Sequence, residues 1–311
     1  MPSKSSITNL LYLSIPIFFA NLALPLVAIV DTGLMGNLDD ASYLTATSIA
    51  SSLFSMIFLS FGFLRMGTVG MVAQAYGSNQ YNEIIDLVFR NITFVIVISL
   101  LLICFQHFIF NLGLQIFDLS NDTEKYFNDY FYIRIYSSFG ELSIYVITGL
   151  FIGLQKTKTS SLMVGFFSIT NIIFSLFFVL YLKLNVTGVA LGTLVSSTLT
   201  SFIFLIYTFF ELKKLTIINF DIKKIFNIKK IKNIFNINFN IFIRSVLLTF
   251  SFLFFTYLGN TISEDVVAAN TILINLIFLS AFILDAYAFS TEGIVGYSIG
   301  SKNITLLRNV I

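Results

Sequence analysis

The sequence contains one cysteine, one histidine and few charged residues, and each of these scarcities excludes a class of protein. Cys104 has no second cysteine for an intramolecular disulfide or a cysteine-based metal site, and a single histidine, His107, excludes a multi-histidine site. Charged residues make up 11% and apolar residues 57% of the 311 residues. In soluble domains about 25% of the residues are charged and about 45–50% are apolar. The difference excludes a soluble α/β enzyme and a disordered or disulfide-rich secreted protein. We expect no bound cofactor.

Long apolar runs are the main feature that the sequence does have. A helix needs about 20 apolar residues to cross the hydrocarbon core of a bilayer. The runs are continuous over that length and do not alternate, which indicates helices and not the strands of a membrane barrel. Eight runs qualify, at about 8–33, 43–64, 84–112, 127–154, 160–182, 187–210, 237–260 and 266–290. We predict an all-α polytopic membrane protein with about eight transmembrane helices, in contact with the lipid bilayer.

The distribution of Lys and Arg predicts the orientation of these helices. If the N-terminus is cytoplasmic, the inner segments contain fifteen basic residues and the outer segments three, which are Lys125, Arg134 and Lys183. We therefore expect both termini in the cytoplasm, with the protein in the plasma (inner) membrane. Seven inner lysines lie between Lys213 and Lys232. A loop that faces anionic lipid explains them better than a nucleic-acid-binding patch does.

An internal repeat connects distant parts of the chain. The segment GTVGMVAQAYGS at 67–78 aligns without a gap with STEGIVGYSIGS at 290–301, a shift of 223 residues. Two glycine pairs match in this alignment, Gly70 with Gly293 and Gly77 with Gly300. Each copy follows an apolar run of the same orientation, which predicts parallel repeats of the kind found in transporters.

The repeat predicts how the chain is divided. We expect a six-helix lobe at 1–210, a basic cytoplasmic linker at 211–236 and the first two helices of a second lobe at 237–311. A complete pair of repeats would have about 440 residues, as in parallel-repeat transporters. The 311 residues are fewer than this, which either a fragment of a longer chain or a natural truncation would explain.

Ionisable residues inside membrane spans are costly and are therefore functional candidates. Asp31 closes the first span, six residues after Pro25 and in the same span as Pro16. Pro25 has no N–H, so it leaves the carbonyl of Asn21 without its helical partner and bends the helix. A poorly solvated carboxylate beside such a kink could load and release a proton, or bind Na⁺ together with exposed carbonyls. The alternative is a solvated aspartate at a helix end.

Three further acids lie in or beside the spans. Asp285 and Glu292 are seven residues apart and share a helix face, where they could form a paired acid site, although Glu292 also fits the cytoplasmic surface. Glu141 lies two turns after Arg134, either in an intramembrane ion pair or facing a cavity. Stripes of Ser and Thr at 48–55 and 193–201 are explained first by close helix packing and second by a water-filled cavity.

Several motifs along the whole chain are similar to those of one transporter family. They are Ile15–Pro16 with Asn21, PLVAIVDT at 25–32, GFLRMGTVGMVAQAYG at 62–77, GLQKT at 153–157, NII at 171–173, GVALGT at 188–193, and LDAYA at 284–288 with Glu292. With these motifs the chain resembles the multidrug and toxic compound extrusion (MATE) transporters, specifically the DinF-like branch. The resemblance implies twelve helices in two six-helix lobes around a cavity that opens alternately to either side. It also implies cation-coupled export of bulky, often cationic or amphipathic compounds, with Asp31 acting in the coupling.

The chain departs from the family pattern in three respects. Ser175 stands four residues after Asn171, where family members often carry Asp, so Asn171 and Ser175 are the expected neighbours of Asp31. Tyr297 stands where the second-lobe pattern usually has Gln. The 311 residues extend through only eight of the twelve implied helices.

These features predict an antiporter and not an enzyme. It would use H⁺ or Na⁺ to export drugs or other amphipathic or cationic small molecules across the plasma membrane by alternating access. One alternative is a flippase for a lipid-linked or polysaccharide precursor, which would need a more basic cavity than Arg134 and Arg244 provide; another is an inactive truncated remnant. A membrane-embedded enzyme is disfavoured, because only Asp39 and Asp40 are adjacent aspartates and no HExxH motif occurs.

Overall fold

The computed structural model describes residues 6–38, 40–117, 119–217, 227–262 and 264–310, and every element in these ranges is helical. The segments in these ranges that are long and apolar enough to cross a membrane are Leu10–Gly36, Ala41–Gly77, Tyr81–Cys104, Asn121–Gly153, Thr157–Tyr181 and Asn185–Leu215. The expected fold class, an all-α polytopic membrane protein, is confirmed. Asp39 and three of the inner basic residues, Lys4, Lys223 and Lys224, lie outside the described ranges.

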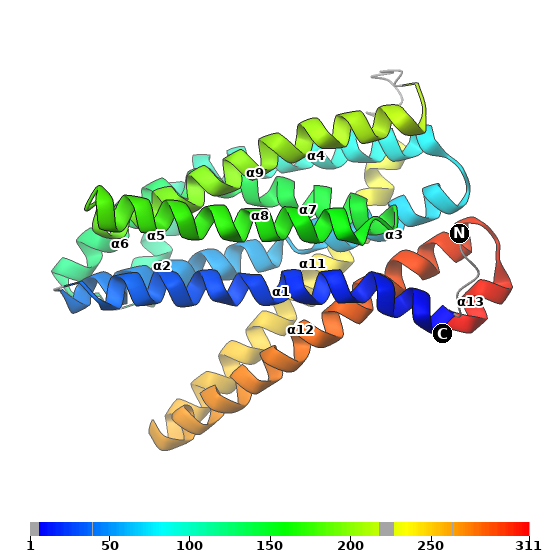
Figure 1. Cartoon of the computed structure of the whole chain (residues 1–311). Helices are drawn as coiled ribbons and strands as arrows, with labels where there is room; N and C mark the ends of the chain where they lie inside the picture. Colours follow the sequence, from blue (N-terminus) through cyan, green and yellow to red (C-terminus); the bar gives the residue numbers. More distant parts are fainter. Residues whose placement is uncertain (1–5, 39, 118, 218–226, 263, 311) are drawn as a thin grey trace.

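The first part of the chain forms a bundle of helices that run along a common direction (Figure 1). They are α1 (Ser6–Gly36), α2 (Ala41–Ser60), α3 (Phe63–Gly77), α4 (Tyr81–Cys104), α5 (Gln106–Ile116), α6 (Asn121–Arg134), α7 (Ser138–Gly153), α8 (Thr157–Leu176) and α9 (Asn185–Leu215). A 3₁₀ turn, Ile135–Ser137, joins α6 to α7, and a π-helical turn, Phe177–Tyr181, follows α8. The second part consists of α11 (Ile228–Ile262), α12 (Glu264–Gly300) and α13 (Ile304–Val310).

The expected span at 84–112 is wrong as a single helix. It is interrupted at Phe105, whose φ of −92° and ψ of 12° leave the helical region while its N–H still donates to the carbonyl of Leu101 at 2.9 Å. The break has a local signal, because the polar residues Gln106 and His107 follow Phe105 directly within the otherwise apolar run. The expected span at 43–64 continues through α3 to Gly77, and those at 237–260 and 266–290 fall on α11 and α12.

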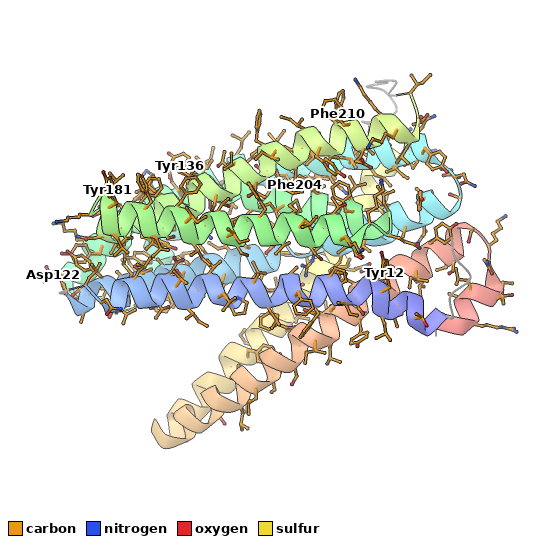
Figure 2. All side chains as sticks on the ribbon, in the orientation of Figure 1. Tyr12, Asp122, Tyr136, Tyr181, Phe204 and Phe210 are labelled. Atoms are coloured by element: carbon orange, nitrogen blue, oxygen red, sulfur yellow. The ribbon has the colours of Figure 1, made fainter. Side chains whose placement is uncertain are left out.

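The outer surface of the bundle carries large apolar and aromatic side chains (Figure 2). Tyr136, Tyr181 and Phe210 are 50%, 77% and 56% exposed. Water would penalise so much exposed apolar surface, whereas hydrocarbon chains solvate it. The surface therefore matches the membrane environment that the composition predicts.

The α11–α12 pair crosses the first bundle and diverges from it toward one end (Figure 1). We name the two ends of the first bundle the Ser6 end and the Asn121 end, after residues that lie there. The pair diverges toward the Asn121 end, while α12 packs against α1 and α3 nearer the Ser6 end. The first bundle and the pair are thus in contact at one end and separated at the other.

The contact between α3 and α12 is reciprocal. Gly77 approaches Tyr297 and Ser301, and a Cβ added to it would lie 2.9 Å from the Ser301 nitrogen. Gly300 approaches Gln74, and its added Cβ would lie 2.8 Å from the Gln74 carbonyl carbon. Gln74 and Tyr297 are equivalent under the 223-residue shift, as are Gly77 and Gly300. Such reciprocity is what a two-fold axis between repeats produces; the boundaries of the lobes stay a prediction.

Candidate functional site

A cavity of about 620 Å³ lies among α1, α2, α6, α7, α8 and α9. Among the described residues that line it, the charged ones are Asp31, Arg134 and Glu141. The α2 stripe contributes hydroxyl groups to this wall, from Thr47, Ser48, Ser51, Ser52 and Ser55. Of the two interpretations of that stripe, cavity lining is therefore the one that the structure shows. The stripe on α9 is mainly packing, since Ser196, Ser197 and Thr200 are fully buried.

Asp31 projects from the last turns of α1 into this cavity. Its Oδ1 atom is buried and accepts no hydrogen bond from the described residues. The Ser175 hydroxyl and the Arg134 guanidinium are its polar neighbours. A buried carboxylate oxygen without a donor is costly, so this atom favours the arrival of a proton or a cation.

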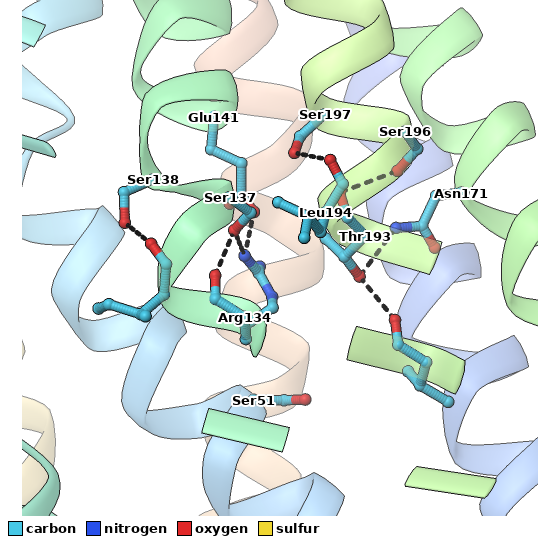
Figure 3. Close-up of polar contacts among 12 residues, drawn as sticks. Ser51, Arg134, Ser137, Ser138, Glu141, Asn171, Thr193, Leu194, Ser196 and Ser197 are labelled. Carbon is cyan, nitrogen blue, oxygen red and sulfur yellow. Dashed lines mark hydrogen bonds and ion pairs between the residues drawn. The ribbon is translucent and has the colours of Figure 1, made fainter. Parts of the chain in front are cut away.

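A short chain of neutral polar groups lies beside Asp31. Asn171 and Ser175 are four residues apart on one face of α8 and are fully buried. Asn171 Nδ2 donates to Thr193 Oγ1 of α9 at 3.1 Å (Figure 3), and Ser175 Oγ donates to Asn171 Oδ1 at 3.5 Å. The close approach of α8 and α9 requires Gly192, because a Cβ there would lie 2.6 Å from Ser175 Oγ. Thr193 belongs to this group, although the sequence indicated it only as part of a stripe.

Arg134 and Glu141 form an ion pair in the cavity wall (Figure 3). Ser137, in the 3₁₀ turn between α6 and α7, has its hydroxyl oxygen 2.6 Å from the Arg134 carbonyl oxygen and 3.2 Å from Glu141 Oε1, so its one proton has two possible acceptors. The guanidinium carbon of Arg134 also lies 5.2 and 5.3 Å from the ring centres of Phe54 and Phe58. Glu141 is thus paired with Arg134 and also lines the cavity. Both of the alternatives that the sequence left open, an intramembrane ion pair and a cavity-facing acid, are therefore present.

Asp285 and Glu292 lie outside this cavity, beside Arg65 of α3. Arg65 packs over the ring of Phe289, with 3.9 Å between its guanidinium carbon and the ring centre. Asp285 is exposed and Glu292 is half-buried near Gly70. Their shared helix face therefore points to the contact between α3 and α12 and not to Asp31.

Pro16 and Pro25 both lie inside α1, which continues as one helix through them. Asn21 lies between the prolines and is 8% exposed. Its Nδ2 donates to the carbonyl of Phe282 in α12 at 3.3 Å. A side chain that connects α1 to a helix 261 residues later has no local signal in the sequence. The predicted release of the Asn21 carbonyl by Pro25 stays a prediction.

A second polar cluster lies at the Ser6 end of α4. Arg90 is 2% exposed and donates to Glu83 at 3.0 Å and to Asp86 at 3.3 Å. The other carboxylate oxygen of Glu83 pairs with Lys230 at the start of α11. Arg90 is one of the fifteen inner basic residues, and its spacing of four and seven residues from the two acids is a sequence signal for ion pairs on one helix.

The comparison with family models decides the family. The MatE model matches residues 16–177, which is more than half of the chain. This chain belongs to the MatE family. The expected resemblance is confirmed, and the family is one of transporters and not of enzymes. Among the described residues, no group of three or more His, Cys, Asp or Glu side chains could hold a metal ion.

Individual proteins are similar to the chain in sequence or in structure. The chain is 28% identical over 306 residues to DNA damage-inducible protein F of Escherichia coli (strain K12), in a match that covers 98% of this chain and 66% of that protein. It superposes with a TM-score of 0.88 on a MOP superfamily transporter from Pyrococcus furiosus, at 17% identity over 99% of this chain and 68% of the other. An outward-facing multidrug resistance MATE family transporter gives the same TM-score at 18% identity, with 99% and 68% covered. The chain thus spans about two thirds of the length of these relatives, and the two structures show the fold that it shares.

Proposed function

We propose that this protein is an antiporter that exports amphipathic or cationic small molecules, including drugs, in exchange for H⁺ or Na⁺ across the plasma membrane. The observation that carries the proposal is the buried Oδ1 of Asp31, which has no donor among the described residues and lies at the edge of a polar cavity. A coupling ion and a cationic cargo would both satisfy this oxygen. Since both need the same carboxylate, the binding of one displaces the other.

Helix α1 connects this carboxylate to the switch between conformations. Asn21 contacts α12, Pro25 lies four residues later, and Asp31 lies in the cavity. Occupancy of Asp31 would bend α1 at Pro25 and alter its contact with α12. The coupling ion must bind one conformation more tightly than the other, because equal affinity shifts no equilibrium. With the Ser6 end in the cytoplasm, as the Lys and Arg distribution predicts, the divergence of α11 and α12 corresponds to an outward-facing state.

The flippase alternative is disfavoured by the charges in the cavity. A lipid-linked phosphate needs unpaired cations in its binding site. Arg134 is the cation among the described lining residues, and Glu141 already neutralises it. The cavity therefore suits a cation better than a phosphate.

Reconstitution of the protein into proteoliposomes tests the proposal. Asp31→Asn should reduce cation exchange to the level of empty vesicles, under an imposed proton gradient or a Na⁺ gradient, whichever drives the wild type. The matched control is Asp122→Asn, because Asp122 is exposed at the start of α6 (Figure 2) and should keep wild-type exchange. Exchange that persists in Asp31→Asn would refute the assignment, and a wild type that exchanges nothing under either gradient would favour the inactive remnant.

A further inference from the structure

The cavity contains an arginine that the coupling of cation and cargo through Asp31 does not use. Arg134 comes from α6, Glu141 from α7 and Asp31 from α1, and Tyr130 of α6 also faces them. The described lining residues from α2, α8 and α9 supply hydroxyl, amide and apolar groups and no charge. With Asp31, Arg134 and Glu141 ionised, the cavity therefore has a net charge of −1.

The Arg134–Glu141 pair is held tightly enough to act as a neutral unit. The two side chains are only 11% and 15% exposed. Ser137 contacts both of them, and the rings of Phe54 and Phe58 cover the guanidinium. Separating two charges in such a poorly hydrated place is costly. Glu141 is thus occupied, and its charge is not available to a ligand.

The count of free acids in the cavity is then one. Ser175, the neighbour of Asp31 on α8, adds a hydroxyl and no second carboxylate. When Asp31 binds a proton, the net charge of the cavity changes from −1 to zero. When Asp31 releases the proton, the net charge of −1 matches a cargo with one positive charge. A dication would leave one charge uncompensated in a site of low effective dielectric, where such an excess is strongly disfavoured.

We propose that Arg134 determines the charge class of the cargo: by neutralising Glu141, it makes the cavity prefer monovalent organic cations to divalent ones. This inference rests on the proposed function of Asp31 and adds the selectivity of the same site. Arg134 acts through Glu141, its ion-pair partner, and not as a ligand of the cargo. Without its guanidinium, Glu141 becomes a second acid in the cavity and a dication is matched.

Ethidium and propidium form a matched pair of probes, since they share one aromatic ring system and differ by a quaternary ammonium side chain. Equilibrium dialysis with the purified full chain in detergent would measure the affinity for each dye. The wild type should bind ethidium about tenfold more tightly than propidium, which corresponds to about 1.4 kcal/mol. Arg134→Gln should abolish or reverse this ratio, and Arg134→Lys should retain it. Arg308→Gln, which removes an exposed arginine on α13, is the control and should leave the ratio unchanged.

The double variant Arg134→Gln with Glu141→Gln separates charge from structure. It restores one free acid and should return the dye ratio to the wild-type value. Glu141→Gln alone leaves an unpaired guanidinium beside Asp31 and should lower the affinity for both dyes. This variant tests the same inference if Arg134→Gln does not fold. The inference is overturned if Arg134→Gln changes both affinities by the same factor, or if the double variant keeps the ratio of the single one. If Asp31→Asn leaves ethidium binding unchanged, the proposed function itself fails, whatever the variants of Arg134 do.

Discussion

Replacing Arg90 by Met should destabilise the protein far more than replacing Lys230 by Met, although both changes remove a cation from Glu83. The Arg90 side chain is 1% exposed and contacts two carboxylates, whereas the Lys230 side chain is 44% exposed. Removing one partner from a fully buried ion pair costs about 3–5 kcal/mol. Because Glu83 and Asp86 keep 26% and 13% exposure, we expect Arg90→Met to lower the free energy of unfolding by about 3 kcal/mol. Lys230→Met should lower it by at most about 1 kcal/mol.

Titration of the detergent-solubilised protein with sodium dodecyl sulfate, followed by far-ultraviolet circular dichroism, would measure both changes. A triple variant that combines Arg90→Met with Glu83→Gln and Asp86→Asn is the control, because it removes the charges together. It should recover most of the lost stability, since a neutral buried site costs less than one with an excess of negative charge. Equal effects of Arg90→Met and Lys230→Met would refute the reasoning, as would a triple variant no more stable than Arg90→Met.

Two glycine substitutions test the close contacts of the fold. Gly192→Ala places a Cβ 2.6 Å from Ser175 Oγ, so it should push α8 from α9, lower stability by about 1–3 kcal/mol and weaken the binding of ethidium. Gly300→Ala places a Cβ 2.8 Å from the Gln74 carbonyl carbon and should weaken the contact between α3 and α12, seen as faster hydrogen exchange at the Ser6 end with unchanged dye binding. The control for both is Gly165→Ala, where no atom lies within 4 Å of the added Cβ and neither measurement should change. A stability of Gly192→Ala equal to that of the control would contradict the packing argument.

The arrangement of the two polar clusters suggests how the site and the contact between helices depend on each other. The Asp31 cavity lies toward the Asn121 end of α1, whereas Lys230 and Glu83 connect α11 to α4 at the Ser6 end. Asn21 connects α1 to α12 between them. A change in α1 would therefore reach α12 through the contact of Asn21 with Phe282.

Much of the fold could be predicted from the sequence, because the signals are local or repeated. Apolar runs of span length predict transmembrane helices, since every backbone polar group in lipid must be satisfied within the segment. The matched glycines at positions 77 and 300 predicted a repeat, and both lie in the reciprocal contact of α3 with α12. An acid beside a proline in an apolar span predicted Asp31 as a candidate, and it lies in the cavity.

Only the tertiary structure decided which side chains meet. Helical periodicity places Asp285 and Glu292 on one face but does not say which helix that face contacts, and the contact proved to be with α3 and Arg65. The hydrogen bond from Asn21 to Phe282 depends on the crossing of two helices far apart in the chain. For Glu141 the sequence left open an ion pair with Arg134 or a place at a cavity, and only the structure shows that both are present. Sequence patterns determine the faces of each helix, whereas helix packing over the whole bundle determines the partner that each face contacts.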